Sequence, residues 1–192
     1  MNTKTKMPKF VRSKERKPTR LKDCDYSENG EYFITICVSG MKECFGEING
    51  GEMVLNEIGK IVKNQLLWLE RQYPYVKLDE WVVMPNHLHA IIVIDDLCFS
   101  DDIIASNMVG NGRDRSLQEM KTKSLSGLVG AFKTTSSKKI HRTGFSSFRW
   151  QKSFYDHIVG IEEELDRIRD YIISNPGKWE EDRNNPKNML NC

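Results

Sequence analysis

The sequence has few of the features that would place a protein outside the cell or in a membrane. Its five cysteines are odd in number and include no Cys-x-x-Cys pair, which argues against a disulfide framework and a structural zinc site. The apolar runs at 33–38 and 90–94 are far shorter than the about 20 residues that cross a bilayer. The basic N-terminus lacks the apolar stretch of a secretory signal. We therefore expect a cytoplasmic protein with reduced thiols and no membrane partner.

The small net charge of +2 conceals two strongly basic segments. Residues 1–22 contain nine lysines and arginines against Glu15 alone, and residues 113–152 contain ten against two acids, so each segment carries +8. The rest of the chain is correspondingly acidic. Segregated basic charge indicates a surface for a polyanion such as a nucleic acid. The competing interpretation is a basic tail without fixed structure plus one solvated helix face, and charge alone leaves both open.

Apolar periodicity predicts a single α+β domain. Alternating and helical patterns give the order β-β-α-β-β-α-β-α, with a long polar loop at 95–123. The expected strands are 31–38, 43–48, 76–84, 88–94 and 153–159, and the expected helices are 56–72, one that begins near 125, and 161 to about 174. The segment 39–42 is expected to turn the first strand back into the second. Hairpins require antiparallel pairing, so we predict a ferredoxin-like antiparallel β-sheet with packed α-helices.

Two of the four histidines form the sequence His87-Leu88-His89 at the start of an expected strand. Side chains alternate along a strand, so the two imidazoles share one face while Leu88 enters the other. Imidazoles at this spacing can converge on one divalent metal ion. The simpler interpretation is a pair of ordinary polar residues at a strand start. A metal site needs further ligands, and the position where histidine-triad hydrolases carry a third histidine is Ile91.

The last expected helix offers further site residues. Tyr171 and Asn175 are four positions apart and therefore lie on one helix face, at the edge of the apolar stripe that must pack on the sheet. This edge can reach a metal ion bound on the sheet. Taken alone, Tyr171 is better explained as a tyrosine at the edge of the core, and Asn175 as a helix C-cap before Pro176.

These residues fall in segments that resemble a known family. The run Trp-Val-Val-Met-Pro-Asn-His-Leu-His at 81–89 resembles the histidine–hydrophobe–histidine (HUH) motif of single-tyrosine transposases, and more closely that of the REP-associated tyrosine transposases. Further matching segments are 31–35, 150–151 with 155–158, and 171–176 with Trp179. The resemblance runs from about residue 17 to residue 180 in the order of the family.

The resemblance implies the HUH nuclease/transposase fold and a metal-dependent DNA strand transferase. It implies that His87 and His89 bind Mg²⁺ or Mn²⁺, that Tyr171 is the nucleophile and that Asn175 is a further metal ligand. The implied substrate is single-stranded or hairpin DNA from palindromic repeats. Cleavage and rejoining would pass through a 5′-phosphotyrosine, as the chemical step of DNA transposition.

Several alternatives stay open beside this assignment. Tyr155 is the second candidate nucleophile, placed after Tyr171 because it lies on an expected strand and has no amide four residues later. His157 is an additional candidate metal ligand. A non-catalytic hairpin-DNA-binding protein would need only the two basic segments, and a phosphohydrolase would need the missing third histidine. Both a monomer and a homodimer are compatible with the resemblance.

The basic segments suggest how DNA would be held. Residues 113–152 lie in sequence between the histidine strand and the tyrosine helix, so we expect them to border the active groove. The residues 1–22 are expected to form an accessory arm, 23–180 the transposase-like domain, and 181–192 a polar C-terminal tail. Individually, most of the basic side chains are better explained by solvent exposure. The candidate phosphate contacts are Lys133, Lys138, Lys139, Arg142, Arg149 and Lys152.

Overall fold

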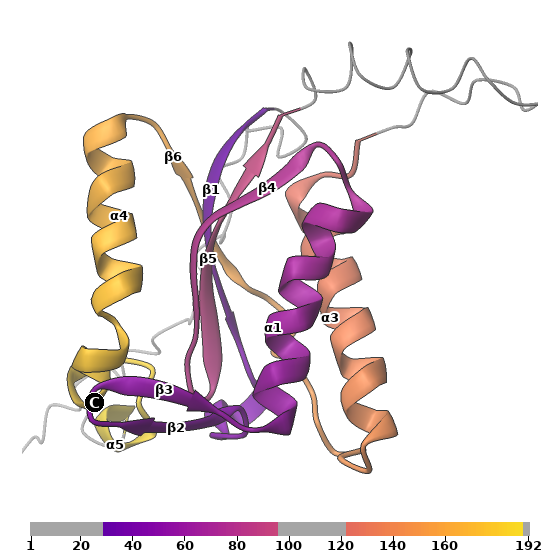
Figure 1. Cartoon of the computed structure of the whole chain (residues 1–192), viewed down its shortest axis with the longest axis vertical. Helices are drawn as coiled ribbons and strands as arrows, with labels where there is room; N and C mark the ends of the chain where they lie inside the picture. The colour runs from indigo at the N-terminus through magenta and orange to yellow at the C-terminus, as the bar shows by residue number, and fades with distance from the viewer. Residues whose placement is uncertain (1–28, 96–121, 190–192) are drawn as a thin grey trace, which may run out of the picture.

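An antiparallel sheet of four strands lies at the centre of the computed structural model, which describes residues 29–95 and 122–189 (Figure 1). The order across the sheet is β4-β5-β1-β6, so the first strand lies inside and the last at an edge. The expected arm at 1–22 and part of the second basic segment, 113–121, lie outside the described residues. The strands are β1 (Gly30–Cys37), β4 (Val76–Val83), β5 (His87–Ile94) and β6 (Tyr155–Val159).

Helices cover both faces of this sheet (Figure 1). The helices α1 (Glu57–Gln72) and α3 (Leu125–Arg142) pack side by side on one face, and α4 (Glu162–Ser174) packs on the other. The succession β1-α1-β4-β5-α3-β6 with its antiparallel sheet is the ferredoxin-like arrangement. The predicted α+β class with an antiparallel sheet and packed helices is confirmed.

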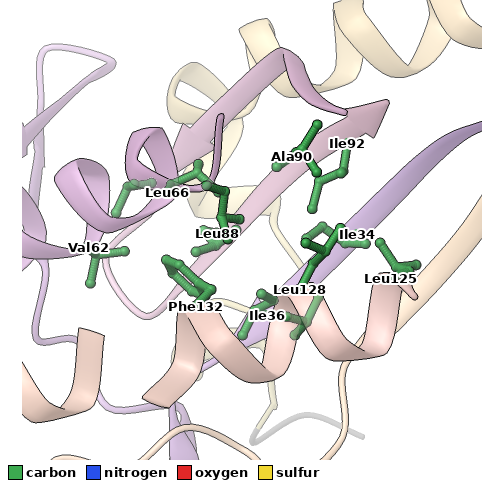
Figure 2. Close-up of a cluster of buried hydrophobic side chains, with 14 of the residues drawn as sticks. Ile34, Ile36, Val62, Leu66, Leu88, Ala90, Ile92, Leu125, Leu128 and Phe132 are labelled. Carbon is green, nitrogen blue, oxygen red and sulfur yellow. The ribbon is translucent and has the colours of Figure 1, made fainter. Parts of the chain in front are cut away.

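The alternation of side chains along β5 divides the core in two. Leu88, Ala90 and Ile92 point into the larger cluster, which they share with residues of α1 and α3 (Figure 2). Ile91 points to the other face and packs against Leu165 and Ile172 of α4. The histidines at 87 and 89 have the parity of Ile91, so the fold places them under α4.

The segment after β1 differs from the prediction. The expected strand 43–48 does not pair with β1, because β5 and β6 already occupy both sides of that strand. Instead, β2 (Gly46–Asn49) pairs with β3 (Glu52–Leu55) as a separate two-stranded sheet. Gly50 and Gly51 form its turn at φ 61° and 84°, a region that glycine enters without steric cost. The sequence prediction took 49–51 as a turn but missed the strand that follows.

The chain after α4 continues past the end of the sheet. A short 3₁₀ helix, η3 (Pro176–Glu181), follows directly, and a single turn of α-helix, α5 (Pro186–Met189), comes after it. Within the described ranges, no helix is long and apolar enough to cross a membrane. Cys37 and Cys44, which lie in these ranges, are free thiols.

Candidate metal and nucleophile site

The two motif histidines meet on the face of the sheet that α4 covers. The Nε2 atom of His87 lies 3.0 Å from the Nε2 atom of His89, and both side chains are buried. The predicted common face of the two imidazoles is therefore present. Two ring nitrogens at this distance require a proton or a metal ion between them, because two lone pairs facing each other repel.

A hydrogen bond at the far side of each ring sets its orientation. Nδ1 of His87 lies 2.7 Å from Oδ1 of Asn86, which can only accept, so Nδ1 carries the proton and Nε2 keeps its lone pair. Nδ1 of His89 lies 2.8 Å from the Thr35 hydroxyl, on the neighbouring strand β1. Partners of this kind fix the tautomer and the ring plane of metal-binding histidines.

Burial keeps both imidazoles neutral at physiological pH. Desolvation lowers the pKa of His87 to about 4, although the nearby Asp182 carboxylate acts in the opposite direction. Desolvation also lowers the pKa of His89 well below its ordinary value, and the neighbouring His87 adds to this effect. A neutral imidazole is the form that binds a metal ion.

Asp182 completes a group of three possible metal ligands. Its Oδ2 atom lies 3.7 Å from Nε2 of His87, and ligand atoms of His87, His89 and Asp182 all lie within 4.8 Å of one another. Oδ1 of Asp182 accepts a hydrogen bond of 2.6 Å from the backbone N–H of Asn184. Sequence reasoning missed this residue, because it falls in the segment 181–192 that was expected to be a tail. No periodicity or motif marks it there.

Asn175 lies beside this group at the C-terminal end of α4, where it is buried. Its Oδ1 atom and Oδ2 of Asp182 are buried acceptors to which no residue within 29–95 and 122–189 donates a hydrogen bond. Buried oxygens without donors cost free energy unless a cation or water satisfies them. Two imidazole nitrogens together with carboxylate and amide oxygens make a mixed donor set that suits a divalent ion such as Mn²⁺ or Mg²⁺. The residues present therefore fit a metal ion.

The Tyr171 hydroxyl reaches this cluster from α4. It lies 3.3 Å from Nε2 of His89, while the phenol ring is 40% exposed. Burial of the inner part of the side chain and the charge of Asp182 raise the pKa of Tyr171, whereas a hydrogen bond from Asn175 lowers it. The raised pKa means that the free phenol is a poor nucleophile unless a cation offsets the negative charge.

The two less favoured site candidates lie on β6. Tyr155 is 46% exposed, and its ring contacts Phe33 edge-on at 6.2 Å between centroids. His157 pairs with Glu164 of α4, with Nε2 2.9 Å from Oε1, and it is not part of the three-residue ligand group. The structure thus brings His87, His89, Asn175 and Tyr171 together and leaves His157 in a separate hydrogen bond with Glu164.

A cavity of about 440 Å³ opens over Tyr171 and His89. Phe33 and Tyr155 line it from the sheet, and Lys178 and Arg183 line it from the segment after α4. Both basic side chains are exposed. They supply positive charge beside the ligand group, and sequence reasoning did not select either of them.

The predicted phosphate contacts lie elsewhere in the fold. The helix α3 covers the opposite face of the sheet, so its basic side chains do not border this cavity (Figure 1). Residues 122–152 lie in sequence between β5 and α4, which carry the site. In space they are separated from the site, because α3 packs on the opposite face of the sheet from α4. On α3 or at its end lie the exposed side chains of Lys138, Lys139 and Arg142, and Lys152 is exposed in the loop before β6.

Two of the predicted contacts are engaged within the protein. The Lys133 ammonium donates to the backbone carbonyl oxygens of Gln151 and Ser153, and burial lowers its pKa to about 8. Nη1 of Arg149 donates to the carbonyl oxygens of Ser146 and Phe148. The Lys133 bonds tie α3 to the loop before β6, and the Arg149 bonds lie within the loop that follows α3.

The fold has a counterpart among solved structures. A REP-associated tyrosine transposase bound to a REP hairpin aligns with a TM-score of 0.49 and 20% identity, over 79% of this chain and 69% of that chain. No family model matches the sequence.

A relative in sequence covers nearly the whole chain. An uncharacterized protein of Haemophilus influenzae is 35% identical over 170 residues, which is 88% of this chain and 92% of the relative. The chain belongs to the same family as this protein.

Proposed function

We propose that the protein cleaves and rejoins single-stranded or hairpin DNA, with Tyr171 as the nucleophile. The observation that carries this proposal is the position of the Tyr171 hydroxyl, 3.3 Å from Nε2 of His89 and next to a buried group of metal-ligand atoms. A tyrosine that served only in packing would not need its hydroxyl next to metal-ligand atoms. Transposition is the process in which such a reaction would serve.

The proposed cofactor is Mg²⁺ or Mn²⁺. His87 and His89 would hold it through their Nε2 atoms, and Asp182 and Asn175 would supply oxygens that accept no hydrogen bond from the residues that the structure describes. A bound divalent cation offsets the charge that develops on a phosphodiester under attack and on its leaving oxygen. The neutral state of the imidazoles and their outer hydrogen bonds prepare the protein for this role.

The proposed reaction balances without a co-reactant. The Tyr171 oxygen forms a bond to phosphorus, and the bond between phosphorus and the 3′-oxygen of the preceding nucleotide breaks. The phenol proton leaves to solvent at the exposed side of the ring, and the departing oxygen takes up a proton as a 3′-hydroxyl. A second 3′-hydroxyl reverses these steps, so that the strand is rejoined without ATP.

Other residues of the cavity would hold the DNA. Lys178 and Arg183 lie where they can contact phosphates on either side of the scissile bond. Phe33 and Tyr155 present aromatic surface at the cavity, which favours stacking of an unpaired base. Within one chain, the Tyr171 hydroxyl lies beside the ligand group, so a single subunit can form the proposed site.

The test is a covalent adduct with labelled DNA. A hairpin with single-stranded flanks is incubated with Mn²⁺ or with EDTA, and the products are separated on a denaturing gel. We expect an adduct with wild-type protein and with Tyr155→Phe, but none with Tyr171→Phe or in EDTA. Tyr155→Phe is the matched control, because it removes a hydroxyl from the same cavity.

Two results would contradict the proposal. An adduct that persists in Tyr171→Phe and is lost in Tyr155→Phe would identify Tyr155 on β6 as the nucleophile. Tight hairpin binding without an adduct under either divalent ion would instead support a non-catalytic DNA-binding protein.

A further inference from the structure

Asn86 is a buried side chain that joins two separate parts of the site. It precedes His87 at the start of β5, and it is fully buried. One end of its amide contacts the histidine, and the other end contacts the segment after η3.

The oxygen end of the amide orients His87. Oδ1 of Asn86 accepts the hydrogen bond of 2.7 Å from Nδ1 of the imidazole. This bond holds the ring so that Nε2 faces His89. A neighbour that fixes the outer nitrogen of a histidine in this way fixes the nitrogen available to the metal ion.

The nitrogen end of the amide anchors the segment that carries Asp182. Nδ2 of Asn86 donates to the carbonyl oxygen of Asn184 at 2.8 Å and to that of Met41 at 3.1 Å. These two acceptors also fix which end of the amide is nitrogen. The backbone N–H of Asn184 in turn donates to Oδ1 of Asp182 at 2.6 Å. A short chain of hydrogen bonds therefore leads from His87 through Asn86 to Asp182.

We propose that Asn86 is a positioning residue that sets His87 and Asp182 in register for one divalent cation. The three ligands come from β5 and from a segment almost a hundred residues later in the chain. That segment includes a turn at 182–185, where the Asn185 N–H donates to the carbonyl oxygen of Asp182, and a single helical turn. The amide of Asn86 is a direct connection between the strand and this turn. The inference rests on the metal site of the proposed function.

The substitution Asn86→Asp distinguishes the effect of the oxygen end of the amide on His87 from the effect of the nitrogen end on the turn. A carboxylate still accepts the proton of His87 Nδ1, and a carboxylate partner makes an imidazole a stronger ligand. At the other end, an oxygen replaces the donor and faces the carbonyl oxygens of Asn184 and Met41, which repel it. An effect through His87 alone would therefore strengthen metal binding, whereas loss of the anchor would weaken it.

One measurement reports on metal binding, and a second reports on how firmly the turn at 182–185 is held. Titration with Mn²⁺ in a calorimeter gives metal affinity, and we expect Asn86→Asp to bind about 10- to 100-fold more weakly than wild type. Limited trypsin digestion followed by intact mass gives the rate of cleavage after Arg183, which is exposed in the anchored turn. We expect this rate to rise about tenfold in Asn86→Asp, because the lost hydrogen bond opens the turn more often.

Thr35→Val is the matched control. It removes the partner of His89 Nδ1 on the same face of the sheet but leaves Asn86 and the turn untouched. We expect it to weaken Mn²⁺ binding without faster cleavage after Arg183. A double variant, Asn86→Asp with Asp182→Ala, should bind Mn²⁺ no more weakly than Asp182→Ala alone, because both changes remove the same ligand.

Mn²⁺ affinity in Asn86→Asp equal to or above that of wild type, or an unchanged rate of cleavage after Arg183, overturns the proposed link. Additive losses in the double variant overturn it as well. Wild-type protein that binds no Mn²⁺ would instead overturn the metal site of the proposed function. The two failures are thus distinguishable in the same set of experiments.

Discussion

Replacement of Asp182 by asparagine should stabilise the protein without metal and remove its response to metal. The Asp182 side chain is 3% exposed, and no residue that the structure describes donates a hydrogen bond to its Oδ2 atom. The His87 imidazole lies 3.7 Å from this oxygen, and burial keeps the imidazole neutral. A buried carboxylate in this position destabilises the folded state unless a cation binds to it.

The size of the effect follows from these contacts. An unsatisfied buried acceptor costs about 1–3 kcal/mol. Asparagine keeps the Oδ1 acceptor for the Asn184 N–H and places an amide donor where Oδ2 now lies. At about 2–4 °C per kcal/mol for a chain of this size, Asp182→Asn should melt about 2–12 °C above wild type in EDTA.

In the presence of Mn²⁺, wild type should melt at a higher temperature than Asp182→Asn. Mn²⁺ at 100 times its dissociation constant adds about 2.7 kcal/mol to the stability of a protein that binds it only when folded. Wild type should therefore gain about 5–11 °C under these conditions, whereas Asp182→Asn should gain little.

The assay is thermal unfolding followed by intrinsic fluorescence, in EDTA and in a series of Mn²⁺ concentrations. Glu181→Gln is the control, because it removes the charge of an exposed carboxylate beside the same cavity. It should respond to Mn²⁺ as wild type does. An Asp182→Asn variant that melts below wild type in EDTA and still gains stability with Mn²⁺ would refute the reasoning.

Two further predictions concern the supports of the site. Leu165→Ala should lower the free energy of unfolding, measured in urea, by about 2–5 kcal/mol, because the side chain fills the small core between α4 and the sheet. A loss below about 1 kcal/mol would mean that α4 is held by other contacts. Replacing Lys178 and Arg183 by glutamine should weaken hairpin binding and flatten its dependence on salt, whereas the same change at Lys138 and Lys139 should leave the cleavage rate at saturating DNA unchanged. Equal loss of binding from both pairs would contradict the separation of the two faces.

The local part of the site was predictable from the sequence. Alternation along a strand places the imidazoles of His87 and His89 on one face, and helical spacing places Tyr171 and Asn175 on one face. These relations depend on neighbouring residues of one element. The structure retains them, with the Tyr171 hydroxyl beside His89.

The long-range part was not predictable in the same way. Asp182 and Arg183 reach the cavity only because η3 turns the chain back over the end of the sheet, and no short-range pattern encodes that turn. The basic side chains of α3 precede the tyrosine helix in sequence but cover the other face of the sheet. Which layer a helix joins depends on the crossovers between strands, so proximity in sequence misplaced the basic groove.

The hairpin β2–β3 illustrates the same limit. Residues 43–48 have the composition of a strand, and the nearest earlier strand was the obvious partner. In the structure β5 and β6 occupy both edges of β1, and Phe45 is instead buried near the end of the sheet, where its N–H donates to the carbonyl oxygen of Pro85. Competition among strands for an edge is a property of the whole fold.

The most direct test of the central claim is the identity of the residue that carries the nucleotide. The adduct of wild-type protein with hairpin DNA is digested with nuclease and trypsin, and the modified peptide is sequenced by mass spectrometry. Trypsin separates the two candidates, because Tyr171 lies in the peptide 170–178 and Tyr155 in the peptide 153–167. Our account predicts a nucleotide phosphate on Tyr171. A phosphate on Tyr155, or an adduct on neither peptide, would contradict it.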